Sequence, residues 1–129
     1  METKDEKLIY ADLTYIIRGA LFEVFNTLGY GYREVYYQRA LVKEFKDLGL
    51  EFQEQAAFPL IFKVLKIGRG ICDFYIEGRV ILEIKQGDRF SRHDIKQLYT
   101  YLKASGLKLG ILVRFSSKGL KFRRVLNIW

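Results

Sequence analysis

The chain has 129 residues, carries a formal net charge of +7 and is half hydrophobic, a composition that excludes a disordered tail. No apolar run reaches the ~20 residues of a membrane-spanning helix. Cys72 is the only cysteine, which excludes an intrachain disulfide and a zinc site built from several cysteines. We therefore expect one domain over residues 1–129 with a hydrophobic core of its own. The charged, mixed-sign start of the chain indicates a cytoplasmic protein.

Helical spacing dominates the first third of the chain. Apolar residues recur three and four positions apart from about residue 8 to Leu28. Asp12 is placed to cap the start of this helix, and Gly29 is placed to end it. A second helix is expected over residues 34–48. Residues 1–7, most of them charged, are expected to form a frayed terminus.

The rest of the chain predicts six strands and one further helix. Pro59, the only proline, separates the first two strands, because its missing N–H favours an edge or a break. Gly68 and Gly70 are expected to turn the chain into the next strand. Ser91 is expected to cap the helix, which ends near Gly106. The strands are expected over residues 50–58, 60–67, 71–76, 80–85, 109–115 and 121–128.

The two strands over residues 71–85 are expected to form a hairpin that carries two carboxylates. If residues 77–79 are its loop, Asp73 lies opposite Glu83, with Lys85 on the same face. Opposite residues have Cβ atoms roughly 5 Å apart, so these like charges repel, and a divalent cation such as Mg²⁺ would suit them. The alternative is an ordinary strand face in water. The other face is expected to be apolar, with Cys72 as an inert buried thiol beside Phe74, Ile76, Val80, Leu82 and Ile84.

Further candidates lie on the helices. Gln97 and Tyr101 are four residues apart, so both side chains project from one helix face. They either reach back over the carboxylates or form a half-buried amide and an amphipathic aromatic at a helix–sheet boundary. His93, one turn earlier, has at most a supporting role, because a sole histidine cannot build a multi-histidine metal site. Glu34, at the start of the second helix, is either an acid favoured by the helix dipole or a third acid leaning over the hairpin.

Charge is distributed unevenly along the chain. From Gln86 onward the only acidic residues are Asp88 and Asp94, against ten basic residues. This asymmetry favours a polyanion such as nucleic acid as the partner. The alternative is a solvated basic surface of the kind that many small proteins have.

Taken in order, these motifs resemble the PD-(D/E)XK nuclease superfamily. Asp73 followed by Glu83-Ile84-Lys85 resembles its signature, and Gln97-x-x-x-Tyr101 resembles the extra motif of its RecB-like exonuclease branch. Residues 31–37 (GYREVYY) are similar to the signature of the GxxExxY family, small proteins placed in the same superfamily. The similarity runs from about residue 13 to residue 125. Histidine, proline and asparagine are usual where this sequence has Phe25, Tyr30 and Arg114.

The resemblance implies a restriction-endonuclease-like α/β core, with a mixed β-sheet flanked by helices, and a metal-dependent nuclease that hydrolyses DNA. Asp73, Glu83 and the backbone carbonyl of Ile84 would bind Mg²⁺ or Mn²⁺. Glu34 would contact the metal directly or through water, and Lys85 would orient or deprotonate the attacking water. The residues implied to hold the nucleic acid are Gln97, Tyr101, Arg89, Arg92 and Lys96.

The same residues are compatible with two other functions. The nearest alternative enzyme is a junction resolvase, because such proteins are also small and basic and use the same acid–acid–lysine site in a homodimer. The non-enzymatic alternative is a DNA-binding or partner-binding module with a vestigial site, since a fold does not fix a function. Selectivity for four-way junctions would favour the first, and metal-independent binding that survives loss of Asp73 would favour the second.

Overall fold

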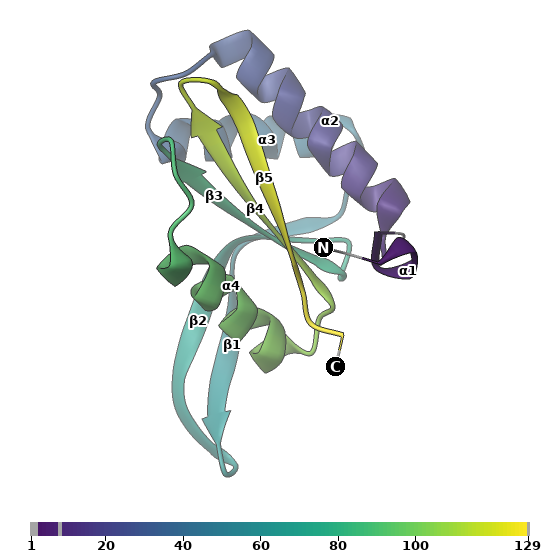
Figure 1. Ribbon diagram of the computed structural model, residues 1–129, viewed down its shortest axis with the longest axis vertical. Coiled ribbons are helices and arrows are strands. Elements are labelled where there is room, and N and C mark those ends of the chain that lie inside the picture. Colours follow the sequence, from purple (N-terminus) through teal and green to yellow (C-terminus); the bar gives the residue numbers. More distant parts are fainter. Residues whose placement is uncertain (1–2, 8, 129) are drawn as a thin grey trace.

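The computed structural model describes residues 3–7 and 9–128, and in that part of the chain helices flank both faces of a five-stranded sheet (Figure 1). The helices are α1 (Lys4–Lys7), α2 (Ala11–Leu28), α3 (Glu34–Asp47) and α4 (Arg92–Ser105). The strands are β1 (Phe52–Phe62), β2 (Leu65–Ile76), β3 (Val80–Gln86), β4 (Leu109–Ser116) and β5 (Gly119–Leu126). They lie in the order β1-β2-β3-β4-β5, with β3 parallel to β4 and the other neighbours antiparallel.

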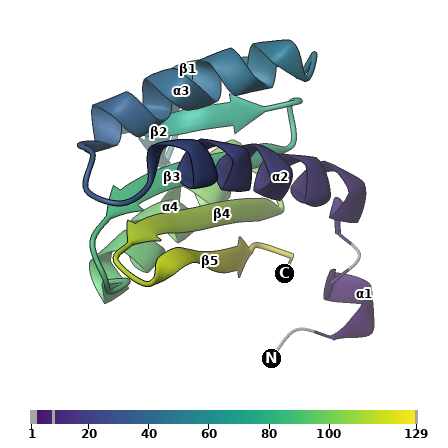
Figure 2. The same cartoon turned by 90° about the horizontal axis from the view of Figure 1, so that it is seen from above.

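Helices α2 and α3 cover one face of the sheet and α4 covers the other, as the view from above shows (Figure 2). Helix α3 contributes Tyr37, Leu41 and Phe45 to the core, and α4 contributes Leu98 and Leu102 to a separate cluster. Burial of such stripes holds the helices in place, because each large apolar side chain contributes roughly 1.5–3 kcal/mol when fully buried. The buried stripe of α2 consists of Leu13, Ile17, Ala20, Leu21 and Val24.

Strands β3 and β4 are buried on both faces. In β3, Val80 and Leu82 pack with the residues of α2 and α3, whereas Ile81 packs beneath α4. Every residue of β4 is buried as well. Parallel strands need a crossover connection, and α4 provides it between β3 and β4. The arrangement is the α/β core with a mixed sheet that the resemblance implied.

The long helices agree with the sequence-based prediction. Helix α2 ends at Gly29, and Ser91 caps α4 by accepting a hydrogen bond from the Asp94 N–H at 3.0 Å. The predicted frayed terminus is wrong for Lys4–Lys7, which form α1, while residues 1, 2 and 8 lie outside the described part. The N-cap of α2 is Tyr10 rather than the expected Asp12. Within the described ranges, no helix has the length and apolarity needed to cross a membrane.

The first strands differ from the prediction. Strand β1 runs without a break through Pro59, which lies on an edge strand where a missing N–H is tolerated. The chain then turns at Lys63 and Val64, and β2 continues through Gly68 and Gly70. The four strands expected over residues 50–85 are therefore three, and the two glycines are strand residues rather than turn residues.

The apolar face expected for the hairpin is also partly wrong. Phe74 packs in the cluster beneath α2 and α3, but Cys72 packs with Ile81 beneath α4. The β1–β2 pairing skips Gln55, which has a φ of 49°, and Asp73, so the regular alternation of faces is interrupted there. Burial raises the pKa of Cys72 to about 12, so the thiol stays protonated, in agreement with the inert role expected for it.

Candidate active site

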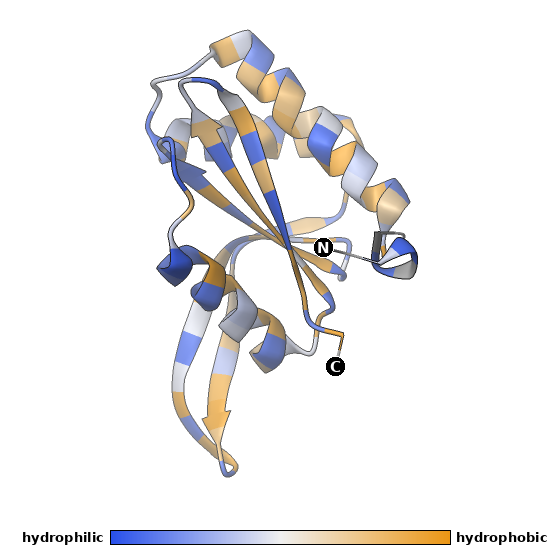
Figure 3. Cartoon of the chain, viewed as in Figure 1, coloured by the Kyte–Doolittle hydropathy of each residue, from blue (hydrophilic) through white to orange (hydrophobic). Residues whose placement is uncertain are grey.

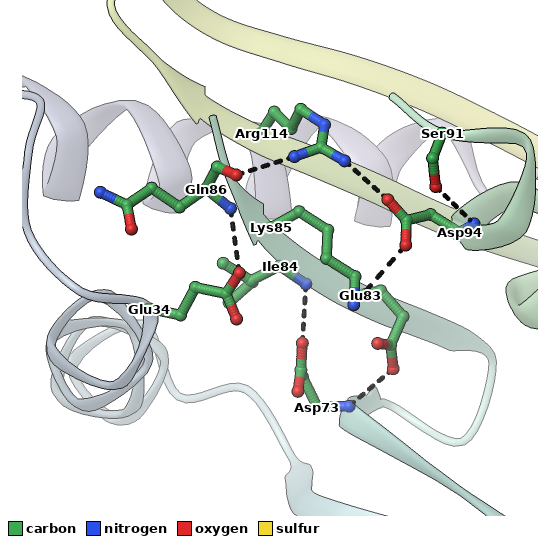
Figure 4. A network of polar contacts seen from close by, with 9 residues as sticks. All are labelled: Glu34, Asp73, Glu83, Ile84, Lys85, Gln86, Ser91, Asp94 and Arg114. Carbon is green, nitrogen blue, oxygen red and sulfur yellow. Dashed lines mark hydrogen bonds and ion pairs between the residues drawn. The ribbon is translucent and has the colours of Figure 1, made fainter. Parts of the chain in front are cut away.

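Two carboxylates lie where β2 and β3 separate (Figure 4). The strands pair as far as Phe74 and Leu82. One residue farther, side chains replace the backbone ladder: the Asp73 N–H donates to Glu83 Oε1 at 2.8 Å, and the Ile84 N–H donates to Asp73 Oδ2 at 2.7 Å. Each carboxylate is thus held by a backbone N–H of the opposite strand, and this fixes the two acids side by side.

Burial makes these carboxylates harder to ionise. Glu83 is only 6% exposed, and this burial, together with the charge of Asp73, raises the pKa of Glu83 to about 8. Burial also raises the pKa of Asp73, although the Ile84 N–H and the charge of Lys85 act in the opposite direction. The positive charge around the pair therefore does not offset the loss of solvation.

Lys85 lies beside the carboxylates in a polar network (Figure 4). Its Nζ is 3.9 Å from Asp94 Oδ1, and its side chain is 27% exposed. Asp94 Oδ2 accepts a hydrogen bond from Arg114 Nη2 at 2.6 Å, and Arg114 Nη1 donates to the Gln86 carbonyl at 2.8 Å. Since Asp94 comes from α4 and Arg114 from β4, two later elements of the chain hold the end of β3 and its lysine.

Glu34 reaches the same end of β3 from the first turn of α3. Its Oε1 accepts a hydrogen bond from the Gln86 N–H at 3.0 Å, and its charge raises the pKa of both carboxylates of the pair. The loop before it is closed by Tyr37, whose hydroxyl donates to the Gly29 carbonyl at 2.6 Å. Glu34 is therefore near enough to act on the pair while one of its oxygens binds the backbone of β3.

Gln97 and Tyr101 lie on α4 and line a groove of about 380 Å³ between this helix and the β1–β2 hairpin. Tyr101 is 8% exposed, and its ring packs directly on Gly70 of β2. Burial raises the pKa of Tyr101, and the charge of Glu83 adds to the shift. Tyr101 is thus a packed residue beside the carboxylates, whereas the half-buried Gln97 faces the groove.

The basic residues of the C-terminal half do not all contribute to the surface. Arg89, Arg92 and Lys96 are exposed, on α4 or just before it. His93 is also exposed, and it lines the groove. Arg114 is only 7% exposed, because it is held in the polar network. The expected basic surface is therefore present along α4, without Arg114.

Sequence reasoning missed two positions next to the pair. Asp94 looks like an ordinary first-turn acid three residues after the capping Ser91. The sequence feature that could have indicated Asp94 is Arg114. This arginine stands in place of the usual asparagine and, once buried, needs an acidic partner. The Gln55 side chain acts against the rise that burial causes in the pKa of Asp73. Its φ of 49° is rare for a glutamine in a strand, and no local sequence pattern indicates it.

The donor set suits a hard divalent cation. Within residues 3–7 and 9–128, no three His, Cys, Asp or Glu side chains lie close enough together to hold a metal ion, so Glu34 is not grouped with the pair. Mg²⁺ needs only one or two carboxylates, because waters complete its coordination. The half-buried Asp73 and the buried Glu83, both with raised pKa values, fit such an ion.

Comparisons with known proteins address the fold and the family. The sequence profile of the PD-(D/E)XK nuclease superfamily matches residues 11–125. Among curated proteins, none matches the chain. An alkaline exonuclease (LHK-Exo) from Laribacter hongkongensis has a similar structure over 98% of this chain and 73% of its own, with 12% sequence identity and a TM-score of 0.54. SSO0001 is similar over 91% of this chain and 78% of its own, with 15% identity and a TM-score of 0.48. At 12% identity, the likeness to the exonuclease concerns the fold alone.

Proposed function

Because the chain belongs to the PD-(D/E)XK nuclease superfamily, we propose that it is a metal-dependent nuclease that hydrolyses phosphodiester bonds of DNA. The observation that carries this proposal is the pair of the half-buried Asp73 and the buried Glu83, held where β2 and β3 separate, with Lys85 beside it. Burying two carboxylates without full charge compensation destabilises a fold, so a protein that keeps them is expected to use them.

The carboxylate pair is the proposed metal site. Members of the superfamily typically use divalent metals, and Asp73, Glu83 and the carbonyl of Ile84 would hold Mg²⁺ or Mn²⁺. A bound ion would lower the pKa of a coordinated water and offset negative charge on the phosphate. Glu34 would contact the ion through water, because one of its oxygens already accepts the N–H of Gln86.

Lys85 is the proposed partner of the attacking water. Its side chain is 27% exposed and its Nζ lies 3.9 Å from Asp94 Oδ1, so it can meet a substrate that arrives from solvent. It would orient or deprotonate the water and neutralise charge that develops on the phosphate. Asp94 would act through Lys85, as a positioning residue.

The face of α4 is the proposed nucleic-acid surface. Gln97 would contact the substrate from the groove, and Tyr101 would set the position of α4 against β2. The exposed basic residues would hold the phosphate backbone without reading sequence: they are Arg89, Arg92 and Lys96.

The family motif adds a narrower assignment. On residues 31–37 we propose that the chain is a GxxExxY-type protein, and that residues 1–129 work as one domain. The reduced, buried thiol of Cys72 suits the cytoplasm as its place of action.

The test is cleavage of end-labelled single-stranded DNA, duplex DNA, four-way junctions and RNA, each with Mg²⁺, Mn²⁺ or a chelator. We expect metal-dependent cutting of DNA that Asp73→Ala, Glu83→Ala and Lys85→Ala each reduce by about 10³-fold. Asp47→Ala is the matched control, because this exposed acid at the end of α3 forms only a surface ion pair with Lys43. The control should cut as the parent does.

Other outcomes would change the assignment. Cutting confined to four-way junctions by a homodimer would identify a junction resolvase. No cutting of any substrate, with no Mg²⁺ or Mn²⁺ binding by calorimetry, would contradict the catalytic proposal and leave a binding module on a nuclease fold.

A further inference from the structure

The β1–β2 hairpin extends past α4 and away from the body of the molecule (Figure 1). We call residues 59–69 the arm. The pairing of β2 with β3 covers residues 74–76, so the two strands of the arm are supported by each other. They pair out to Phe62 and Leu65, on either side of the turn.

The arm exposes large apolar side chains. Figure 3 shows hydrophobic residues at its end, interrupted by hydrophilic ones. Exposed apolar patches of this kind mark sites of interaction. The exposed fractions are 55% for Ile61, 57% for Phe62, 95% for Val64, 65% for Leu65 and 63% for Ile67.

The turn at the end of the arm is strained by its own sequence. Lys63 has a φ of 47° and Val64 a φ of 72°. A two-residue turn with positive φ at both positions favours Asn-Gly, and a β-branched residue in this conformation is an outlier. Val64 is 95% exposed, so packing within the described chain does not offset the strain. An apolar side chain that is kept at the tip despite this backbone strain indicates a partner outside the chain.

The charge of the arm selects the class of partner. Lys63, Lys66 and Arg69 belong to it, and the sequence has no acidic residue between Glu54 and Asp73. The arms of two copies would repel each other, which disfavours arm-to-arm pairing. Nucleic acid offers phosphates to the cations and base faces to the apolar side chains.

The base of the arm adjoins the proposed substrate surface. Arg69 from the arm lines the groove of about 380 Å³ together with His93, Lys96 and Gln97 from α4. Lys96 and Gln97 are among the residues proposed to contact the nucleic acid. A strand that lies along α4 would therefore reach the arm without leaving the basic surface.

We propose that the arm is a wedge that opens nucleic acid at a fork, junction or end. Val64 and its apolar neighbours insert against bases, while Lys63 and Lys66 contact the flanking phosphates. The inference rests on the proposed nuclease function and deepens it, because it names the substrate class as DNA with unpaired or easily opened bases.

The test uses Val64→Asn in an Asp73→Asn background, which prevents cutting. Asparagine tolerates positive φ, so the variant should melt at the temperature of the Asp73→Asn parent or above it. The probe is a forked DNA with a fluorescent adenine analogue at the fork. Binding by the parent should raise the fluorescence as the base unstacks, and Val64→Asn should lose most of that rise. Tyr15→Gln, at an apolar residue 80% exposed on α2, is the matched control and should keep it.

A second variant tests the charges. The double change Lys63→Gln and Lys66→Gln should weaken binding to every DNA and reduce the slope of log affinity against log salt by about 2. The wedge is overturned if Val64→Asn unstacks the fork as the parent does. It is also overturned if Val64→Asn instead dissociates a dimer, or abolishes binding to phosphatidylglycerol vesicles while fork binding stays unchanged.

The two proposals fail separately. If the protein with Asp73 intact cuts no DNA but unstacks forks through Val64, the wedge stands and the nuclease proposal falls. If Val64→Asn in the Asp73 protein cuts forked and linear DNA at the parent's rates, the nuclease proposal stands and the wedge falls.

Discussion

Strand β2 has two halves of opposite character. In the half near β3, Cys72, Phe74 and Ile76 are at most 1% exposed, because their side chains pack in the two core clusters that the helices cover. In the outer half, residues 65–67 are all exposed, because β1 is the strand's partner there and the arm lies beyond the helices. The same extended backbone forms core in one half and a projecting arm in the other.

The candidate site lies near the boundary between these halves. Where β3 leaves β2, the N–H groups of Asp73 and Ile84 lose their ladder partners, and buried N–H groups need acceptors. The carboxylates of Glu83 and Asp73 provide them. Strand separation thus creates the donors that hold two acids side by side, which explains why the pair occurs at this point of the sheet.

The largest expected effect on stability comes from truncating one phenylalanine in each of the two regions. Phe74→Ala should reduce the free energy of unfolding by about 3–5 kcal/mol, because it leaves a cavity in the core. Phe62→Ala in the arm should change it by less than about 1 kcal/mol, because Phe62 is 57% exposed. Urea denaturation with unchanged m-values measures both. Equal losses would show that the arm is part of the cooperative core.

The next effect is a pH dependence of stability, and it comes from Glu83 in the candidate site. The pKa of Glu83 is about 8, above its ordinary 4.5, so between these values the folded protein keeps a proton that the unfolded chain releases. Stability therefore falls as pH rises through this window. Glu83→Gln keeps an acceptor for the Asp73 N–H and has no proton to lose, so above pH 8 it should be more stable than the parent, by at most about 5 kcal/mol.

Thermal unfolding over a range of pH, without metal, measures this difference. Near pH 4.5, the ordinary pKa of Glu83, the parent and Glu83→Gln should have similar stability. Mg²⁺ should stabilise the parent and not the variant, since the ion binds the charged form. A variant that is less stable than the parent at alkaline pH would contradict the raised pKa.

The smallest expected effect on stability locates the boundary between the core half and the outer half of β2. A Cβ at Gly70 would overlap the ring of Tyr101, whereas a Cβ at Gly68 would be in ordinary contact with Leu60, 3.8 Å away. Gly70→Ala should therefore reduce the free energy of unfolding by about 1–3 kcal/mol, and Gly68→Ala by less than about 0.5 kcal/mol. Denaturant midpoints of the two variants measure the contrast. A tolerated alanine at Gly70 would move the boundary inward, toward Asp73.

Local rules predicted the parts of the fold that local forces determine. Helix α2 ends at Gly29 and α4 ends at Gly106, because these glycines adopt positive φ. The pairing of Ile76 with Val80 follows from a three-residue loop. The turn at Lys63 and Val64 was missed, because neither residue favours positive φ.

Contacts between distant elements were beyond these rules. Gly70 was expected in a turn, and its actual constraint is the ring of Tyr101, which becomes visible only once α4 docks on β2. In the site, the spacing of Asp73 and Glu83 within one hairpin was enough to place them together. Asp94 and Arg114 are twenty residues apart, and they meet because α4 and β4 pack side by side.

The order of the sheet also bears on how the molecule assembles. Each strand pairs with its neighbours in the chain. The units β1–β2–β3 and β4–β5 can therefore each form by closing short loops, which costs little chain entropy. The parallel contact of β3 with β4 has to span residues 87–108, and we expect it to form last. Asp73 and Glu83 belong to the first unit, whereas Asp94, which orients Lys85, lies within that span, and Arg114, which holds Asp94, lies beyond it. A nascent chain would thus hold Asp73 and Glu83 in place before Lys85 is oriented, and we expect the proposed activity only once folding is complete.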